Sequence, residues 1–288
     1  GSYNISLGFQ AGQNYQATVS TAGTCSIAIG NQSGQNTQGI NAIAIGYQAG
    51  QFTQGSSSVS IGYQAGQTNQ GSNAVAIGNG AGQSQGASAI AIGQIAGNIK
   101  QGNFAIAIGH YSGQWTQNTY GIAIGLYSSQ YNQGINGISL GNLAGQANQS
   151  TNSIAIGYQA GQTYQGLGGT ITTSTIAIGT SSGQNYQGLN SIAIGNNTGQ
   201  STQGVNSISI GNSSGQSQQG QYSVALGYQA GQNFQAIGST AGSCAIAIGN
   251  QAGQNTQGIN AIALGFQAGQ NNQSLNSVAI GSSAGSSN

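Results

Sequence analysis

A short repeat constrains this chain more than any other feature. A hydrophobic triplet closed by glycine, (Ile/Val)-(Ala/Ser)-(Ile/Leu)-Gly, occurs seventeen times in 288 residues. Thirteen of the sixteen intervals between its glycines are 15 or 16 residues long, and the other three are 22. A unit this short cannot bury a core of its own, so each repeat must be one coil of a stacked array. We therefore predict that residues 1–288 form a single repeat array.

Each repeat contains one clearly apolar strand. In the coil that begins at Ala42, small and branched residues alternate up to Ile45, which is the two-residue period of a β-strand. We predict that Ile43 and Ile45 point into the coil and that Gly46 turns the chain with a positive φ. Sixteen residues are too few for a helical crossover, so equivalent strands are expected to stack in parallel. The prediction is an all-β fold, a parallel β-solenoid of about 17 coils with a 16-residue period.

Glutamine recurs at fixed positions of the polar arm that follows each strand. Side-chain amides at equal heights of a parallel stack can hydrogen-bond from coil to coil. We predict two such amide ladders, one through Gln35, Gln51 and Gln67 and another through Gln38, Gln54 and Gln70.

The composition excludes several function classes. The chain has no Asp or Glu, one Lys or Arg and one His. Carboxylate bases and carboxylate metal ligands are therefore absent, and so is the basic surface that nucleic-acid binding requires. We expect no enzyme, catalytic residue, cofactor, metal site or nucleic-acid partner. Stability should hardly change between about pH 3 and 9. No apolar run reaches the length of a membrane-spanning helix, so no membrane-spanning segment is expected.

The residue between the two branched residues of each triplet is always Ala or Ser. If the branched residues point inward, these small residues form an outer strip that another backbone can approach closely. We predict self-association through this strip into a trimer or an end-to-end filament. In the first half of the chain the strip comprises Ala28, Ala44, Ser60, Ala76, Ala91, Ala107 and Ala123.

The three longer intervals gain six residues at one coil position, after Gln16, Gln165 and Gln235. Loop inserts are expected within 17–25, 166–175 and 236–244. Two of them are near copies that end at Cys25 and Cys244. Thirteen coils, or about 60 Å, would separate these cysteines, so they cannot pair within one straight array. Three alternatives stay open: free buried thiols, disulfides between chains at equal height, or a reactive site.

Other residues offer weaker candidates. His110 has no carboxylate, thiol or second histidine at ligand spacing, so a surface histidine is the simpler interpretation. Aromatic side chains cluster in adjacent coils and could stack on sugar rings, or they could form a plain exposed ladder. They are Tyr111, Trp115, Tyr127 and Tyr131. A solenoid that recognises carbohydrate or ice through a flat polar face is the alternative function.

The block (Ser/Ala)-(Ile/Val)-Ala-Ile-Gly, often preceded by Asn as in Asn152-Ser-Ile-Ala-Ile-Gly, resembles the head repeats of YadA-type trimeric autotransporter adhesins. Similar haemagglutinin-like repeats occur in fibre-like viral and environmental proteins. The resemblance implies a left-handed β-roll, three chains around a common axis, and a fibre on a cell or virion surface that binds host or matrix glycans or proteins.

This sequence departs from the family in its longer coil and its Gln-rich arm. It also shows no neck, stalk or membrane anchor. The expectation is therefore an extracellular structural or adhesin-like fibre, without the autotransport mechanism.

Overall fold

The computed structural model describes residues 3–14, 25–167, 174–236 and 243–287. They belong to two compact units, Gly1–Gly137 and Ile138–Asn288. Within these described ranges every regular element is a β-strand, and none is a helix. Each coil contributes a strand from the apolar triplet, here called a triplet strand. Most coils add a second strand, of two to five residues, from the polar arm, here called an arm strand.

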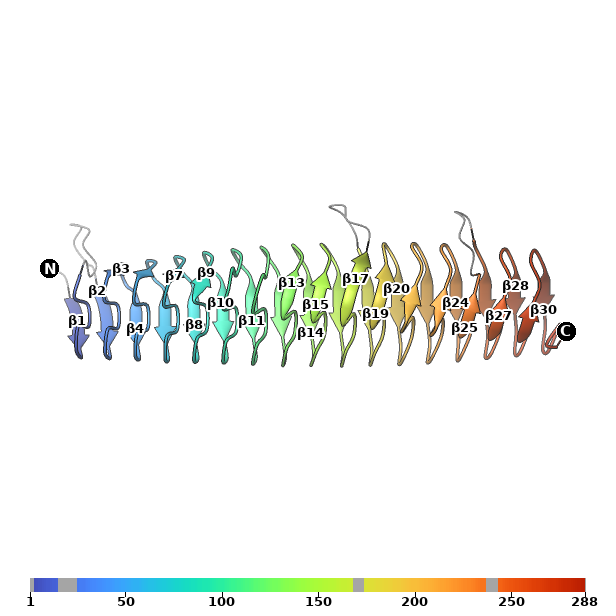
Figure 1. Cartoon of the computed structure of the whole chain (residues 1–288), viewed down its shortest axis with the longest axis horizontal. Helices are drawn as coiled ribbons and strands as arrows, with labels where there is room; N and C mark the ends of the chain where they lie inside the picture. Colours follow the sequence, from blue (N-terminus) through green and yellow to red (C-terminus); the bar gives the residue numbers. More distant parts are fainter. Residues whose placement is uncertain (1–2, 15–24, 168–173, 237–242, 288) are drawn as a thin grey trace. The chain divides into compact units, whose positions relative to one another are not determined.

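The first unit stacks its triplet strands side by side in parallel (Figure 1). Ile43 pairs with Val59 and Ala44 with Ser60, so like positions lie next to like positions. The triplet strands are β1 (Tyr3–Leu7), β2 (Cys25–Ile29), β4 (Ile43–Ile45), β6 (Val59–Ile61), β8 (Val75–Ile77), β10 (Ile90–Ile92), β11 (Ile106–Ile108) and β12 (Ile122–Ile124). The arm strands are β3 (Thr37–Gln38), β5 (Thr53–Gln54), β7 (Asn69–Gln70), β9 (Ser84–Gln85) and β13 (Tyr131–Gln133).

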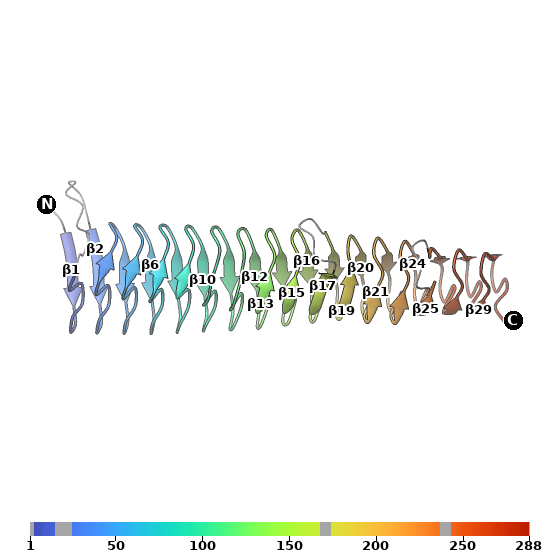
Figure 2. The same ribbon diagram turned by 45° about the horizontal axis from the view of Figure 1, so that its top comes forward.

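The second unit repeats this arrangement, and the turned view shows the same succession of coils (Figure 2). Its triplet strands are β14 (Ile138–Leu140), β16 (Ile154–Ile156), β18 (Ile176–Ile178), β20 (Ile192–Ile194), β22 (Ile208–Ile210), β24 (Val224–Leu226), β26 (Ile246–Ile248), β28 (Ile262–Leu264) and β30 (Val278–Ile280). Its arm strands are β15 (Ala147–Gln149), β17 (Thr163–Leu167), β19 (Asn185–Gly188), β21 (Thr202–Gln203), β23 (Gln218–Gln219), β25 (Asn233–Gln235), β27 (Asn255–Gln257) and β29 (Asn271–Gln273).

These pairings confirm the predicted parallel β-solenoid with a 16-residue period. The register also passes the longer intervals, since Gln165 of β17 pairs with Gln187 of β19. The predicted inserts within 17–25, 166–175 and 236–244 lie largely outside the described residues. The left-handed sense of the coil stays a prediction.

The predicted inward direction of Ile43 and Ile45 is wrong. Both are only half-buried, whereas Ala44 between them is fully buried, and every triplet strand from β2 to β30 likewise buries its central residue. The strand period was correct, but alternation alone does not say which face is inside. The reason for the reversal is the thinness of the coil. A Cβ placed on Gly50 in the opposite wall would lie 3.4 Å from the Ala44 Cβ, so the space between the walls holds only small side chains.

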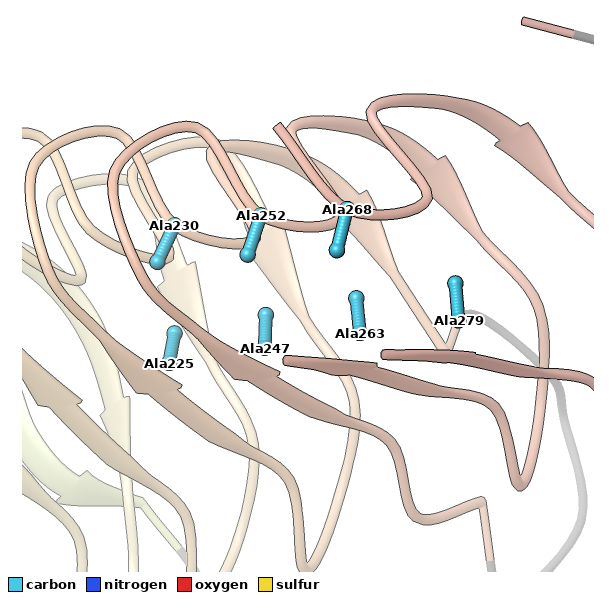
Figure 3. Close-up of a cluster of buried hydrophobic side chains, with 7 residues drawn as sticks. All are labelled: Ala225, Ala230, Ala247, Ala252, Ala263, Ala268 and Ala279. Carbon is cyan, nitrogen blue, oxygen red and sulfur yellow. The ribbon is translucent and has the colours of Figure 1, made fainter. Parts of the chain in front are cut away.

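Alanine methyl groups fill this interior. Figure 3 shows two facing rows in the second unit, one on the triplet strands and one on the bend that follows each glycine. The rows comprise Ala225, Ala247, Ala263 and Ala279 on one side and Ala230, Ala252 and Ala268 on the other. The triplet glycine closes the strand because the backbone turns there with a positive φ. At Gly46 φ is 132°, which confirms the predicted positive value. A Cβ on Gly46 would lie 2.5 Å from the carbonyl oxygen of Gly62 in the next coil.

One glutamine per coil completes the interior. Gln54 is 1% exposed and donates from Nε2 to the backbone oxygen of Ile43 at 2.7 Å. Its equivalents in both units make the same bond to their own triplet strands, for example Gln203 to Ile192. These glutamines tie the arm to the triplet strand across the coil. A buried amide therefore joins the two walls where an ordinary core would place a large apolar side chain.

Candidate self-association surface

The outer side chains of the triplet strands form a broad aliphatic surface on each unit, here called the aliphatic face. Because the strands pair in register, the two branched residues of each triplet build two parallel columns. Most members are half-buried by their neighbours in the column, and several are exposed, including Ile61 (37%) and Leu140 (43%). In a chain without carboxylates, nothing on this face carries a negative charge to repel an apolar partner.

The predicted self-association strip lies on the opposite side of these strands. Its members are buried at 0% exposure inside the coil, so they cannot form an interface: Ala28, Ala44, Ser60, Ala76, Ala91, Ala107 and Ala123. The outward surface that sequence reasoning missed is the aliphatic one. A signal for it was present, because a position that tolerates only Ala or Ser in every coil fits a narrow interior better than a free surface.

Aromatic side chains flank this face where they directly follow the triplet glycine. Tyr47 and Tyr63 stack there, with ring centroids 5.2 Å apart and an interplanar angle of 9°. Both rings are more than 40% exposed. They extend the apolar surface beyond the glycine turn.

Outward glutamines form the hydrogen-bonded ladders of the arm. Gln51 donates to Gln35 and Gln67 to Gln51, each at 3.0 Å, which confirms the first predicted ladder. The second predicted row points inward: Gln38, Gln54 and Gln70 each donate to the carbonyl of a triplet residue. A ladder through Gln32, Gln48 and Gln64, next to the first, was not predicted.

In the second unit, one ladder continues without interruption through eight coils. Each glutamine donates from Nε2 to Oε1 of the preceding one, at 2.9–3.0 Å. The series comprises Gln146, Gln162, Gln184, Gln200, Gln216, Gln232, Gln254 and Gln270. Because all donors point the same way, the bonds can polarise one another. The ladders stabilise the stack. They also use the amide groups of these glutamines for bonds within the chain, whereas a flat polar binding face would need those groups for a ligand.

Neither Cys25 nor Cys244 forms a disulfide within the chain, and both are exposed, so the alternative of buried thiols is wrong. In β2 the side chains alternate, so Cys25 lies on the same side as the half-buried Ile27 and Ile29 and opposite the buried Ser26. Shallow cavities of about 160 and 190 Å³ adjoin Cys25 and Cys244. Each cavity is lined by an Asn of the next coil, Asn41 or Asn260. The Cys25 thiol is thus placed at the margin of the aliphatic face.

The weaker candidates are also located. His110 contacts Tyr111 and Tyr127, with ring centroids at 4.2 and 5.9 Å. Trp115 stacks on Tyr131 at 6.2 Å. Among the residues that the structure describes, no three His or Cys side chains gather in a way that could hold a metal ion. No helix of this described part is long and apolar enough to cross a membrane.

The family model for the YadA head domain repeat matches the chain in two copies, at residues 37–50. Residues 37–50 are therefore similar to the head repeat of YadA-type proteins. The match runs from the arm strand β3 through the triplet strand β4 to Gly50, and therefore includes both walls of a coil. No curated protein and no solved structure matches the chain. The YadA-type repeat thus agrees with the β-solenoid, and the side chains of its triplet can be assigned: small residue inside, branched residues outside.

Proposed function

We propose that this chain is an extracellular, non-enzymatic structural fibre with an adhesin-like role on a cell or virion surface. The observation that carries the proposal is the aliphatic face, two columns of branched side chains left outside the coil. Apolar patches larger than a few hundred Å² on soluble proteins mark interaction sites. The similarity to YadA-type repeats indicates which partner covers this face: further copies of the same chain, because adhesins with such heads are trimeric. In this proposal three copies pack their aliphatic faces around a common axis, and host or matrix glycans or proteins are the adhesion targets.

Each step of the proposal rests on a separate feature. The face repeats at every coil, so an interface along one unit can exceed the roughly 1,000 Å² of total buried area that a stable association needs. The near-zero net charge removes electrostatic repulsion between copies. A trimer that uses this face leaves the amide ladders of the arm outside, where they provide a hydrated surface.

A disulfide between chains belongs to the same proposal. In a parallel assembly, equivalent residues of different copies lie at the same height. Cys25 points to the side of the aliphatic face, and Cys244 occupies the same coil position as Cys25. Oxidised protein should therefore show dimers linked by disulfides on non-reducing gels, and Cys25→Ser with Cys244→Ser should remove them. Oxidised protein that stays monomeric on those gels would reject the disulfide.

Sedimentation of the whole chain tests the assembly. We expect a discrete trimer for the wild type and a shift to monomer when the face is charged by Ile45→Lys with Ile61→Lys. Phe52→Lys with Thr53→Lys is the matched control, because these residues are exposed on the arm, and it should stay trimeric. A wild-type monomer at high micromolar concentration, or a trimer that survives the lysines on the face, would overturn the proposal. If the wild type sediments as open-ended polymers, the proposed trimer is wrong and the assembly is a filament.

The alternative, a solenoid that binds ice or carbohydrate through a flat polar face, has less support. The flat sheet surface is aliphatic, and the amides of the arm bond to one another.

A further inference from the structure

The first unit contains one patch that differs from the rest of the chain, here called the aromatic–cationic patch. It comprises Lys100, His110, Tyr111, Trp115, Tyr127 and Tyr131. The only Lys, the only His and the only Trp of the chain therefore lie within 16 residues. Elsewhere the arm also carries aromatic residues such as Phe52 and Tyr164, but no lysine, histidine or tryptophan. The concentration of these unusual side chains on adjacent coils is the observation to explain.

The backbone places Lys100 opposite Thr116 of the next coil, one residue after Trp115. Gln101 and Gln117 form a parallel bridge, and the Gln117 N–H donates to the Lys100 carbonyl at 3.3 Å. The segment that ends at Gln101 therefore runs beside the segment that ends at Gln117. Lys100 is exposed, Trp115 is 44% exposed, and its stacking partner Tyr131 is 41% exposed. A cation and partly open aromatic rings thus share one stretch of surface.

The charge of Lys100 has no side-chain counterion. The chain contains no Asp or Glu, so no carboxylate side chain of the same copy can pair with it. This lone cation therefore favours an anionic group from outside.

Two of the aromatic side chains stand at a coil position that carries ladder glutamines elsewhere. Tyr111 and Tyr127 occupy the coil position at which Gln48 and Gln64 form ladder bonds in earlier coils. They stack on each other instead, with ring centroids 5.3 Å apart. Replacing hydrogen-bonded glutamine with half-buried tyrosine exchanges a self-satisfied polar surface for an apolar one. Apolar ring atoms beside a cation match the CH groups and the acidic group of an acidic saccharide.

We infer that the aromatic–cationic patch binds an acidic saccharide. A pyranose ring contacts the exposed atoms of Trp115 and Tyr131, and its carboxylate pairs with Lys100. The three residues that contact the saccharide, Lys100, Trp115 and Tyr131, lie on the arm and not among the branched residues of the aliphatic face, so the inference does not depend on the proposed assembly.

Trp115 provides a direct readout, because it is the only tryptophan. The whole chain is titrated with tetragalacturonate while Trp115 emission is followed, and the methyl ester of the same oligomer serves as the uncharged probe. We expect a saturable change with the acid. Lys100→Gln should weaken acid binding about tenfold, to the level of the ester, because the variant loses the one charged contact to the carboxylate; tenfold corresponds to about 1.4 kcal/mol. Tyr131→Ala should weaken the binding of both probes.

Tyr164→Ala is the matched control, because Tyr164 stacks on Tyr186 in the same way without a neighbouring lysine. It should leave both affinities unchanged, and circular dichroism should show that each variant keeps the fold. The inference fails if Trp115 emission does not respond to the acid, or if Lys100→Gln binds it as tightly as the wild type does. It also fails if Tyr131→Ala has no effect, since binding would then require charge alone.

Discussion

Replacing one buried alanine with serine should stabilise this protein, although the change adds a polar group to its interior. Gln203 is buried and donates to Ile192, yet its Oε1 has no hydrogen-bond partner. In the next coil the equivalent Gln219 Oε1 accepts a bond from the hydroxyl of Ser209 at 2.7 Å. Ala193 occupies the position that corresponds to Ser209 and pairs with it in register. Ala193→Ser therefore places a donor where an acceptor is unpaired.

The magnitude follows from the cost of unpaired polar groups. A net intramolecular hydrogen bond contributes about 0.5–1.5 kcal/mol, and we expect a gain in unfolding free energy in this range for Ala193→Ser. The reverse change, Ser209→Ala, leaves Gln219 Oε1 without that donor and should cost about 1–3 kcal/mol. Ala247→Ser is the control, because the corresponding Gln257 Oε1 already accepts from Gln235 at 3.1 Å. A buried hydroxyl there gains less, so the change should be neutral or destabilising.

Urea unfolding followed by circular dichroism measures these differences. The slopes of the transitions should agree, so that a shift of the midpoint reports stability. Sedimentation should show the same oligomeric state for all variants. If Ala193→Ser is no more stable than Ala247→Ser, the unpaired Gln203 oxygen is not a cost to the fold and the reasoning is wrong.

Three further predictions test the coil. Gly50→Ala should cost about 2–4 kcal/mol in urea unfolding, because φ is +53° and the new Cβ would lie 2.8 Å from Gln54 Oε1; a loss below about 1 kcal/mol would show that the walls can move apart. The urea midpoint should stay constant between about pH 3 and 9, since no Asp or Glu exists to titrate; acid unfolding near pH 4 would contradict this. The thermal midpoint should rise with protein concentration if the aliphatic face associates, and a midpoint independent of concentration would argue for a monomer.

The sequence predicted the fold because the repeat itself carries the register. A constant interval forces equivalent residues to equal heights, and the alternation around Ala44 defines a strand. Periodicity does not depend on which face is buried, so the same pattern was compatible with Ile43 inside or outside. What decides the direction is the distance between the two walls. That distance depends on Gly50 in the bend and on Gln54 in the arm strand β5, and neither residue belongs to the triplet strand.

The candidate site was less predictable for the same reason. When Ile43 is assumed to point inward, Ala44 must point outward. The predicted self-association strip of Ala and Ser residues therefore inherited the error in the direction of Ile43. The role of Gln54 also depends on the thin interior, since an amide can bridge the coil only where the walls are close. In contrast, the ladder of Gln35 and Gln51 was predictable. Amides at equal heights of neighbouring coils can hydrogen-bond to each other regardless of which side chains fill the interior.

The burial of alanine and the exposure of the branched side chains affect both the folding of one chain and the proposed assembly. Each coil encloses alanine methyl groups, worth about 0.8 kcal/mol each when buried, whereas a branched side chain is worth about 1.5–3 kcal/mol at full burial. Much of that larger contribution is not realised in a single copy, because the branched side chains stay half-exposed. Backbone and amide hydrogen bonds hold the coils in register, and they leave an aliphatic surface whose burial requires another chain. Each coil therefore folds by hydrogen bonding and close packing of small groups, and the proposed assembly would add the larger hydrophobic contribution of the branched side chains.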